Sequence, residues 1–220
     1  MSENIRIPSQ RDQDLLLGDR ARPMAEWPAG WRELWQACDQ CVACPLAKSR
    51  QNVVLFRGAF DAPCLILGEG PGREEDERAL PFCGRSGRLL DAALKALEFS
   101  PQSVHIANMV KCRPPENRTP LPDELAACRP HLRAQFKLLR PRVIILLGNT
   151  AYQNFTGRKE GISKVRGQWL EEQGTWVIGS YHPAYILRDQ RRKPELFEDL
   201  LKARHKLEEL GLMNPMQKPL

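Results

Sequence analysis

The sequence predicts a three-layer α/β/α sandwich around a four-stranded parallel sheet, within one domain over residues 31–210. Four short apolar runs are each ended by turn residues, as expected for strands. The stretches between these runs repeat apolar residues at helical spacing, and such alternation favours a parallel sheet covered on both faces. The length of 220 residues suits one such domain with short extensions. The net charge of +6 is compatible with a polyanionic partner.

The four expected strands lie at residues 64–67, 104–107, 143–147 and 176–178. The first and third runs are apolar at every position, which is typical of strands in a parallel sheet. We therefore expect both of them to be buried on either face by helices.

Helical apolar spacing recurs in four stretches, at residues 31–35, 89–97, 125–139 and 195–210. Pro130 is expected to bend or restart the helix in which it lies, because proline removes a backbone donor. Asn149 is expected to cap the start of a short helix that Gly157 ends. Gly211 should end the last helix in the same way.

The two ends of the chain lack this periodicity. Residues 1–30 mix both charge signs with few apolar positions and are expected to form a loose leader, and residues 211–220 a flexible tail. No apolar signal core opens the sequence, and its longest apolar run, residues 143–147, is far below the ~18 residues that span a bilayer. We expect a cytoplasmic protein that does not associate with membranes.

Polar residues follow three of the expected strands: residues 68–72 (GEGPG), Asn108, and His182 with Pro183. Ligands of open α/β sheets bind at the carboxyl ends of the strands, so these residues are expected to converge. Each cluster alone is compatible with an ordinary turn or a capped histidine, and their coincidence is what predicts a binding site. The glycine-rich segment lacks the spacing and the Lys-Ser/Thr pair of a phosphate-binding loop.

The cysteines form a second constellation. Seven cysteines without a secretory signal favour metal ligation or redox chemistry over disulfides. Cys41 and Cys44 form a CxxC pair, and Cys112 and Cys128 complete a set of four that suits either zinc or an iron–sulfur cluster. Cys38 extends the pair to CxxCxxC, which is similar to the run in ferredoxins.

Four long segments resemble one known family. GEGPGREEDERALPFCGRSGRLLDAAL, NMVKCRPPENRTPLPDE, YHPAYILR and CVACPLAKSR are similar to motifs of the family 4 uracil-DNA glycosylases, which carry a 4Fe-4S cluster. The similarity covers about residues 38–200 in the family's order. It implies the same sandwich fold, with a cluster held by Cys41, Cys44, Cys112 and Cys128, and Cys38 as a spare thiol.

The resemblance also implies roles for the pocket residues. The catalytic set is Glu69, His182 and Asn117, and the substrate-binding set is Gly70, Glu75, Phe82 and Asn108. Phe82 would stack on a flipped uracil, Asn108 would read its edge, and His182 would stabilise the departing base. Water activation is assigned to Glu69, with Glu75 or general electrostatics as alternatives. Cys83 departs from the family's valine beside the base.

The implied activity is that of a monomeric repair enzyme that flips uracil out of DNA and hydrolyses its N-glycosidic bond, leaving an abasic site. Arg113, Leu187 and Arg188 are expected to bind DNA, and Lys111 and the basic residues 191–193 are expected to meet phosphates. The alternatives are a non-catalytic or altered-specificity iron–sulfur DNA-binding module, a zinc protein, and a uracil-DNA cross-linking relative. No inserted histidine follows Arg113, which disfavours the last of these.

Overall fold

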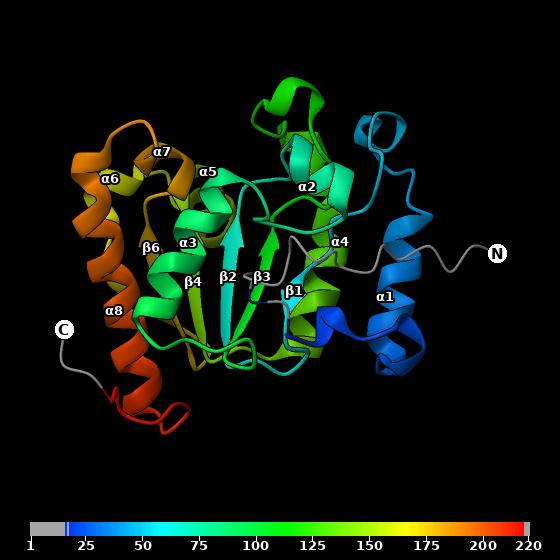
Figure 1. Ribbon diagram of the computed structural model, residues 1–220. Helices are drawn as coiled ribbons and strands as arrows, with labels where there is room; N and C mark the ends of the chain where they lie inside the picture. Colours follow the sequence, from blue (N-terminus) through cyan, green and yellow to red (C-terminus); the bar gives the residue numbers. More distant parts are fainter. Residues whose placement is uncertain (1–15, 17, 218–220) are drawn as a thin grey trace.

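The computed structural model describes residue 16 and residues 18–217 (Figure 1). Within that part of the chain, a six-stranded sheet has the order β1-β3-β2-β4-β6-β5. Its strands are β1 (Arg57–Gly58), β2 (Cys64–Gly68), β3 (Val104–Asn108), β4 (Val143–Leu147), β5 (Trp169–Glu172) and β6 (Thr175–Ser180). The central four run parallel and match the four expected runs, which confirms the predicted sheet. The edge strands β1 and β5 pair antiparallel and are additional to it.

Strand β2 lies between β3 and β4, and all five of its residues are buried. Cys64 pairs with both Val104 and Val143, so the three strands begin in register. At the other end Gly68 pairs with Asn108. The residues that follow β2 and β3 therefore emerge side by side at one edge of the sheet.

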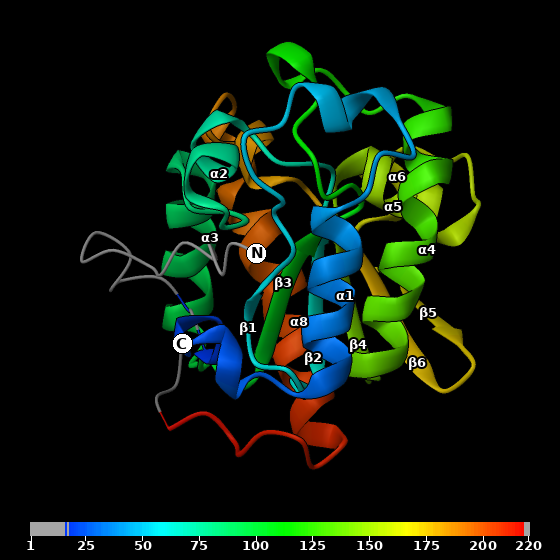
Figure 2. The ribbon, with the colours of Figure 1, turned by 90° about the vertical axis from the view of Figure 1, so that its right-hand side faces the viewer.

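Helices cover both faces of the sheet (Figure 2). One layer contains α1 (Ala29–Asp39), α4 (Pro122–Leu139) and α5 (Gly148–Thr156), with the short α6 (Ile162–Val165) beside α5. The other contains α3 (Arg85–Ala96) and α8 (Lys193–Glu209). The short helices α2 (Arg73–Arg78) and α7 (Pro183–Ile186) lie towards the carboxyl ends of the parallel strands (Figure 1). The predicted three-layer architecture is confirmed, and no described helix has the length and hydropathy to cross a membrane.

Two helix predictions need correction. Helix α4 continues through Pro130 and does not restart there; Pro130 is exposed, so the carbonyl that loses its usual helical donor can be hydrated instead. Asn149 does not cap α5, because the helix begins at Gly148, and the Asn149 side chain accepts from the backbone N–H of Ile162 (2.7 Å). Gly157 ends α5 in the left-handed conformation as expected.

The N-terminal segment is more ordered than the sequence suggests over its described part. Trp27 is 1% exposed, and its ring packs 5.3 Å from the ring of Phe56 and 5.4 Å from that of Phe60. Leu16 is buried in the same core, whereas residues 1–15 and 17 lie outside the described residues. Residues 18–30 therefore pack on the domain, contrary to the expected loose leader.

The described part of the C-terminal tail also contacts the domain. Met213 and Met216 pack against the core, and the backbone N–H of Met216 donates to Glu208 of α8 (2.9 Å). The backbone N–H of Gln217 donates to Glu98 (3.0 Å). Residues 211–217 of the expected tail therefore contact the domain at several points, and residues 218–220 lie outside the described residues.

Candidate active site and cysteine cluster

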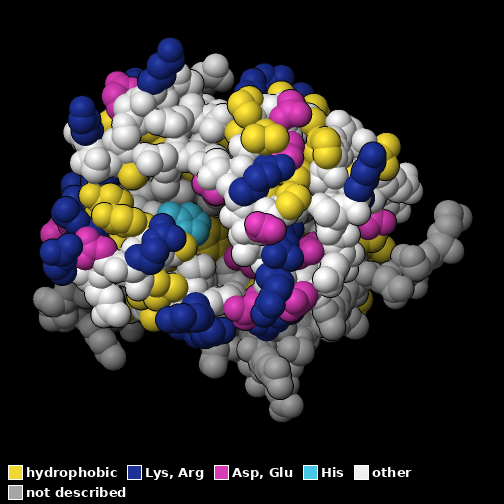
Figure 3. Space-filling model, turned by 90° about the horizontal axis from the view of Figure 1, so that it is seen from above, with side chains coloured by type: hydrophobic (Ala, Val, Ile, Leu, Met, Phe, Trp, Pro, Cys, Tyr) yellow, Lys and Arg dark blue, Asp and Glu magenta, His cyan; other side chains and the backbone are white. Residues whose placement is uncertain are grey.

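A cleft of about 990 Å³ opens where the carboxyl ends of β2, β3, β4 and β6 meet. Figure 3 views this face from above and shows a histidine side chain within the hollow, with Lys and Arg side chains around it. The predicted site residues that line the cleft are Glu69, Gly70, Glu75, Phe82, Asn108, Asn117, His182 and Arg188. The three polar clusters that follow the strands therefore meet in one cavity.

Asn108 is buried at the end of β3, where a carboxylate orients its amide. Its Nδ2 donates to Glu75 Oε2 (3.3 Å), and the same carboxylate accepts from the backbone N–H groups of Gly72 (3.2 Å) and Phe82 (2.8 Å). Burial raises the pKa of Glu75 to about 7, although these hydrogen bonds and the charge of Arg57 oppose the rise. The second Nδ2 proton and the side-chain oxygen Oδ1 of Asn108 remain available to a ligand. Glu75 therefore acts mainly by orienting Asn108.

Phe82 forms a wall of the cleft from a constrained turn. Its φ of 52° lies in the left-handed region that side-chain-bearing residues rarely adopt. Arg57 donates to the carbonyl oxygens of Pro81 (2.9 Å) and Phe82 (3.3 Å) and forms a buried ion pair with Asp91 (2.9 Å). The ring centroids of Phe82 and His182 are 5.5 Å apart. Arg57 and Asp91 were missed because neither belongs to a segment that follows a predicted strand.

Two glycines make room for these side chains. A Cβ atom at Gly68 would lie 2.5 Å from Phe82 Cζ and 2.6 Å from Asn108 Oδ1, closer than real Cβ atoms approach. A Cβ atom at Gly70 would lie 2.9 Å from a methyl carbon of Val110. Glycine at these two positions thus allows close packing against Phe82, Asn108 and Val110.

His182 caps the start of α7. Its Nδ1 accepts from the backbone N–H of Ala184 (3.1 Å). Burial, together with a smaller effect of the charge of Arg188, lowers the pKa of His182 to about 4. The imidazole is therefore neutral at pH 7, and because Nδ1 is an acceptor, the proton resides on Nε2. His182 thus brings a neutral N–H donor to the cleft.

Glu69 and Asn117 occupy different parts of the cleft lining. Glu69 is partly exposed, and its Oε2 accepts from the hydroxyl of Thr150 in the first turn of α5. Asn117 is exposed, and its Oδ1 accepts from Nε of Arg113 (2.7 Å). Asn117 therefore lies at the rim, and Thr150 is a partner that no sequence motif indicated.

The residues expected to bind DNA divide into two groups. Arg188 is exposed and lines the cleft, and Leu187 is half-buried directly after α7. Arg113 is half-buried and paired with Asn117 outside the cleft lining. Lys111 is only 1% exposed, so the expectation that it meets phosphates is wrong. Arg188 therefore remains a candidate for contact between a positive charge at the cleft and a DNA phosphate.

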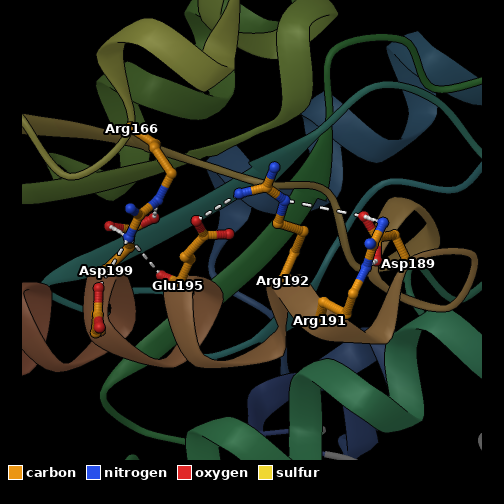
Figure 4. Close-up of polar contacts among 7 residues, drawn as sticks. Arg166, Asp189, Arg191, Arg192, Glu195 and Asp199 are labelled. Carbon is orange, nitrogen blue, oxygen red and sulfur yellow. Dashed lines mark hydrogen bonds and ion pairs between the residues drawn. The ribbon is translucent and has the colours of Figure 1, made fainter.

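The basic run after Arg188 is already paired with acids (Figure 4). Arg191 contacts Asp189 (2.8 Å), and Arg192 contacts Glu195 (2.8 Å) and, at 3.8 Å, Asp189. Because the neighbouring carboxylates offset its charge, this run presents less net positive charge than its sequence suggests.

The four cysteines expected as cluster ligands come from three segments. Cys41 and Cys44 follow α1, Cys112 follows β3, and Cys128 lies in α4. Arg50 joins two of these segments, because its Nη1 donates to Cys112 Sγ (3.3 Å) and to the carbonyl oxygen of Cys41 (2.9 Å). The backbone N–H of Lys111 donates to Cys128 Sγ (3.3 Å). N–H donors thus reach two of the four sulfurs.

The chemistry of this cysteine cluster fits an iron–sulfur group. Within the described residues, the side chains as placed do not form a group of three or more His, Cys, Asp or Glu that could hold a metal, so the fit is one of donor type. The donor set consists of thiols alone, with N–H groups directed at sulfur, which is a common arrangement around iron–sulfur ligands. Cys38 is buried nearby. Burial is the main cause that raises the pKa of its thiol, and Cys128, Cys41 and Cys112 contribute to the rise.

Residues 56–204 match the family model for the uracil DNA glycosylase superfamily. The chain belongs to this superfamily. The resemblance inferred from the motifs is thereby confirmed, and the α/β fold agrees with it.

Several relatives from this superfamily are similar over most of their length. A type-4 uracil-DNA glycosylase of Thermotoga maritima is 44% identical, over 78% of this chain and 92% of the relative. Type-4 uracil-DNA glycosylases of Pyrobaculum aerophilum (40%) and Saccharolobus solfataricus (38%) each match 76% of this chain, and 88% and 82% of their own lengths. The similarity therefore extends over 82–92% of the length of these three relatives.

Proposed function

We propose that the protein is a type-4 uracil-DNA glycosylase that excises uracil from DNA and holds a 4Fe-4S cluster. The names of its relatives and its superfamily membership support the substrate and the reaction. The observation that carries the proposal is the constellation at the ends of β2, β3 and β6: an oriented amide, an aromatic wall and a neutral imidazole donor in one cleft.

Asn108 distinguishes uracil from cytosine by its two remaining hydrogen-bonding groups. Its Oδ1 accepts from N3–H of uracil, and its free Nδ2 proton is donated to O4. Cytosine presents an amino donor in place of O4 and an acceptor in place of N3–H, so both contacts become repulsive. Because Glu75 occupies the other Nδ2 proton, the amide cannot turn over without losing that hydrogen bond. Phe82 provides the face on which the flipped base stacks.

His182 stabilises the leaving group. Cleavage of the C1′–N1 bond leaves its electron pair on the base, so negative charge develops on the carbonyl oxygens of uracil. The Nε2–H group of His182 donates to that charge as it forms. It therefore stabilises the transition state more than it stabilises the bound, intact nucleotide, and this difference lowers the barrier. Since its pKa is lowered to about 4, His182 acts as a neutral hydrogen-bond donor rather than as an acid.

Glu69 orients the attacking water. Its carboxylate is anchored by the Thr150 hydroxyl and lines the same cleft as His182. The water oxygen bonds to C1′ as the base departs, and its proton passes to Glu69. Negative charge on Glu69 also stabilises the positive charge that develops on the sugar.

DNA approaches over α7 and over Leu187 and Arg188, the two residues that follow it. The half-buried Leu187 is suited to fill the space from which the base has rotated, and Arg188 is suited to a phosphate. Cys41, Cys44, Cys112 and Cys128 would hold the cluster, which ties three chain segments together and supplies structure rather than a reaction step.

An excision assay on labelled oligonucleotides tests this function. Strands that carry one uracil should be converted to abasic sites, whereas matched strands with cytosine should stay intact. Asn108→Ala should slow uracil excision by at least about 100-fold, since several hydrogen bonds to the base are lost. Asn108→Asp should release cytosine weakly, because a carboxyl oxygen can accept from the cytosine amino group where the amide donated to O4, and a protonated carboxyl can donate to N3 where the amide accepted.

The result that would overturn the proposal is specific DNA binding without base release by the iron-loaded wild-type protein. It would support the alternative of a non-catalytic iron–sulfur DNA-binding module.

A further inference from the structure

Lys111 is a buried cation between the base-reading residue and the cysteine cluster. It lies three residues after Asn108 and directly before Cys112, and its side chain is almost entirely inaccessible. An ammonium group removed from water is costly unless hydrogen-bond acceptors and negative charge surround it. Its partners therefore indicate what it does.

The ammonium group has two well-placed acceptors. Lys111 Nζ donates to the backbone carbonyl of Asn108 (2.7 Å) and to Oε1 of Gln135 in α4 (2.6 Å). The Met109 N–H donates to the Gly68 carbonyl (2.9 Å) where β2 and β3 end. Just at this point, where regular strand pairing stops, Lys111 supplies the donor for the last carbonyl of β3. It thereby holds the backbone that carries the Asn108 amide.

Gln135 is itself fixed in one orientation. Its Nε2 donates to Nε2 of His105 (2.8 Å) and to the carbonyl of Leu55 (3.3 Å), so its Oε1 must face Lys111. His105 in turn uses Nδ1 to donate to the carbonyl of Ala59 (2.8 Å). Each group in this buried chain is satisfied by the next, which makes the position of the ammonium rigid.

The cysteine cluster lies on the other side of the same residue. The backbone N–H of Lys111 donates to Cys128 Sγ, and the adjacent Cys112 receives an N–H from Arg50 (both 3.3 Å). Thiolates that bind an iron–sulfur group carry negative charge, and a fixed ammonium nearby offsets it. Neither acceptor of the ammonium is an anion, because both are neutral carbonyl oxygens.

We propose that Lys111 is a positioning residue that couples the cysteine cluster to base recognition. Its ammonium holds the Asn108 backbone in register for uracil, and the thiolates of the cluster supply the negative charge that keeps the ammonium in place. This inference rests on the proposed function, in which Asn108 reads the base. Lys111 contacts neither DNA nor substrate.

The test compares Lys111→Met with Lys137→Met, a variant that removes an exposed lysine from α4 and changes the net charge equally. Single-turnover uracil excision by Lys111→Met should be at least about tenfold slower, while affinity for uracil-free DNA matches that of Lys137→Met. Iron should be lost to a chelator about tenfold faster than from Lys137→Met. A wild-type rate of excision or of iron release in Lys111→Met would overturn the proposal.

A double-mutant cycle separates positioning from general damage. In the Asn108→Ala background, Lys111→Met should slow excision by less than about twofold, because the group that it positions is already gone. Full additivity of the two losses would overturn the proposal. A wild-type protein that does not excise uracil would instead contradict the proposed function, so the two failures are distinguishable.

Gln135→Met provides a second route if Lys111→Met does not fold. This variant removes one acceptor but keeps the ammonium and its charge, so excision should slow by about threefold or more while iron release stays at the wild-type rate. Faster iron release with unchanged excision would show that the buried hydrogen bonds of Lys111 and Gln135 only retain the cluster. That result would overturn the proposed coupling between the cluster and base recognition.

Discussion

The cleft and the cysteine cluster differ in how many of their functional side chains are hydrogen-bonded by other groups of the protein. In the cleft, Glu75 accepts three N–H groups, His182 accepts one at Nδ1, and Glu69 accepts from Thr150. In the cluster, hydrogen bonds reach the sulfurs of only two of the four predicted ligands among the described residues. The comparison teaches that protein groups alone orient the polar side chains of the cleft, whereas two of the four cysteine sulfurs have no such partner among the described residues and are left for the proposed cluster.

The largest effect is expected from removing a cluster ligand. Cys112→Ala should lose the visible absorbance, the bound iron and much of the soluble protein, because Cys112 connects the segment after β3 to the Cys41–Cys44 pair. Cys38→Ala is the matched control, since it removes a buried neighbouring thiol outside the ligand set. Iron analysis and absorbance of the purified proteins measure the difference. Bleaching by Cys38→Ala but not by Cys128→Ala would contradict the ligand assignment.

In the cleft, a comparable deletion should leave the fold intact and affect only chemistry. His182→Ala should slow single-turnover excision by about 100- to 1000-fold, because its donor acts on charge that develops during bond cleavage. Binding of uracil-containing DNA should change little, which a titration beside the kinetics would show. A variant that loses DNA affinity while retaining the cleavage rate would make His182 a residue of docking instead.

Glu75 predicts a pH effect on stability. The folded protein holds its proton up to about pH 7, whereas an ordinary glutamate releases it near 4.5. The free energy of unfolding should therefore fall as the pH rises between these values, by at most about 3 kcal/mol, and Glu75→Gln should remove this fall. Urea unfolding at pH 5 and pH 8, with the exposed Glu172→Gln as control, measures it. Equal pH dependence in wild type and Glu75→Gln would show that burial does not govern this carboxyl.

The smallest effect concerns the salt dependence of DNA binding. Arg188→Ala should lower the slope of log affinity against log salt by about one unit, because Arg188 is exposed at the cleft. An Arg191→Ala, Arg192→Ala double variant should change the slope by less than that, since Asp189 and Glu195 already pair with both guanidinium groups. A loss of about two units in the double variant would show that DNA displaces these ion pairs.

The parallel sheet was accessible from the sequence because both faces of its central strands are buried and therefore apolar. The edge strands gave no such signal: β1 has only two residues, and β5 places Glu171 and Glu172 in solvent. The packing of the N-terminal segment depends on Trp27 meeting Phe56 and Phe60, a tertiary contact without local periodicity. Such contacts are visible only once the core exists.

The sequence indicated many of the residues that line the cleft but not the partners that hold them in place. Strand ends placed Asn108 and His182 at one edge, and the resemblance placed Glu69 in the catalytic set and Glu75 in the substrate-binding set. Neither indicated that Glu75 accepts from the Asn108 amide or that Glu69 accepts from Thr150. Lys111 was assigned to phosphates because positive charge near a DNA-binding segment ordinarily lies on the surface. Its burial follows from Gln135, a residue in α4 that no motif connects to it.

Gly68 has a consequence for attempts to change which base this cleft accepts. The position packed against Phe82 and Asn108 already holds the smallest residue, so no substitution there can enlarge the pocket. Any larger residue displaces the ring or the amide. Engineering towards bulkier lesions must therefore proceed through the side walls, and variant libraries that randomise position 68 should return only glycine among active clones.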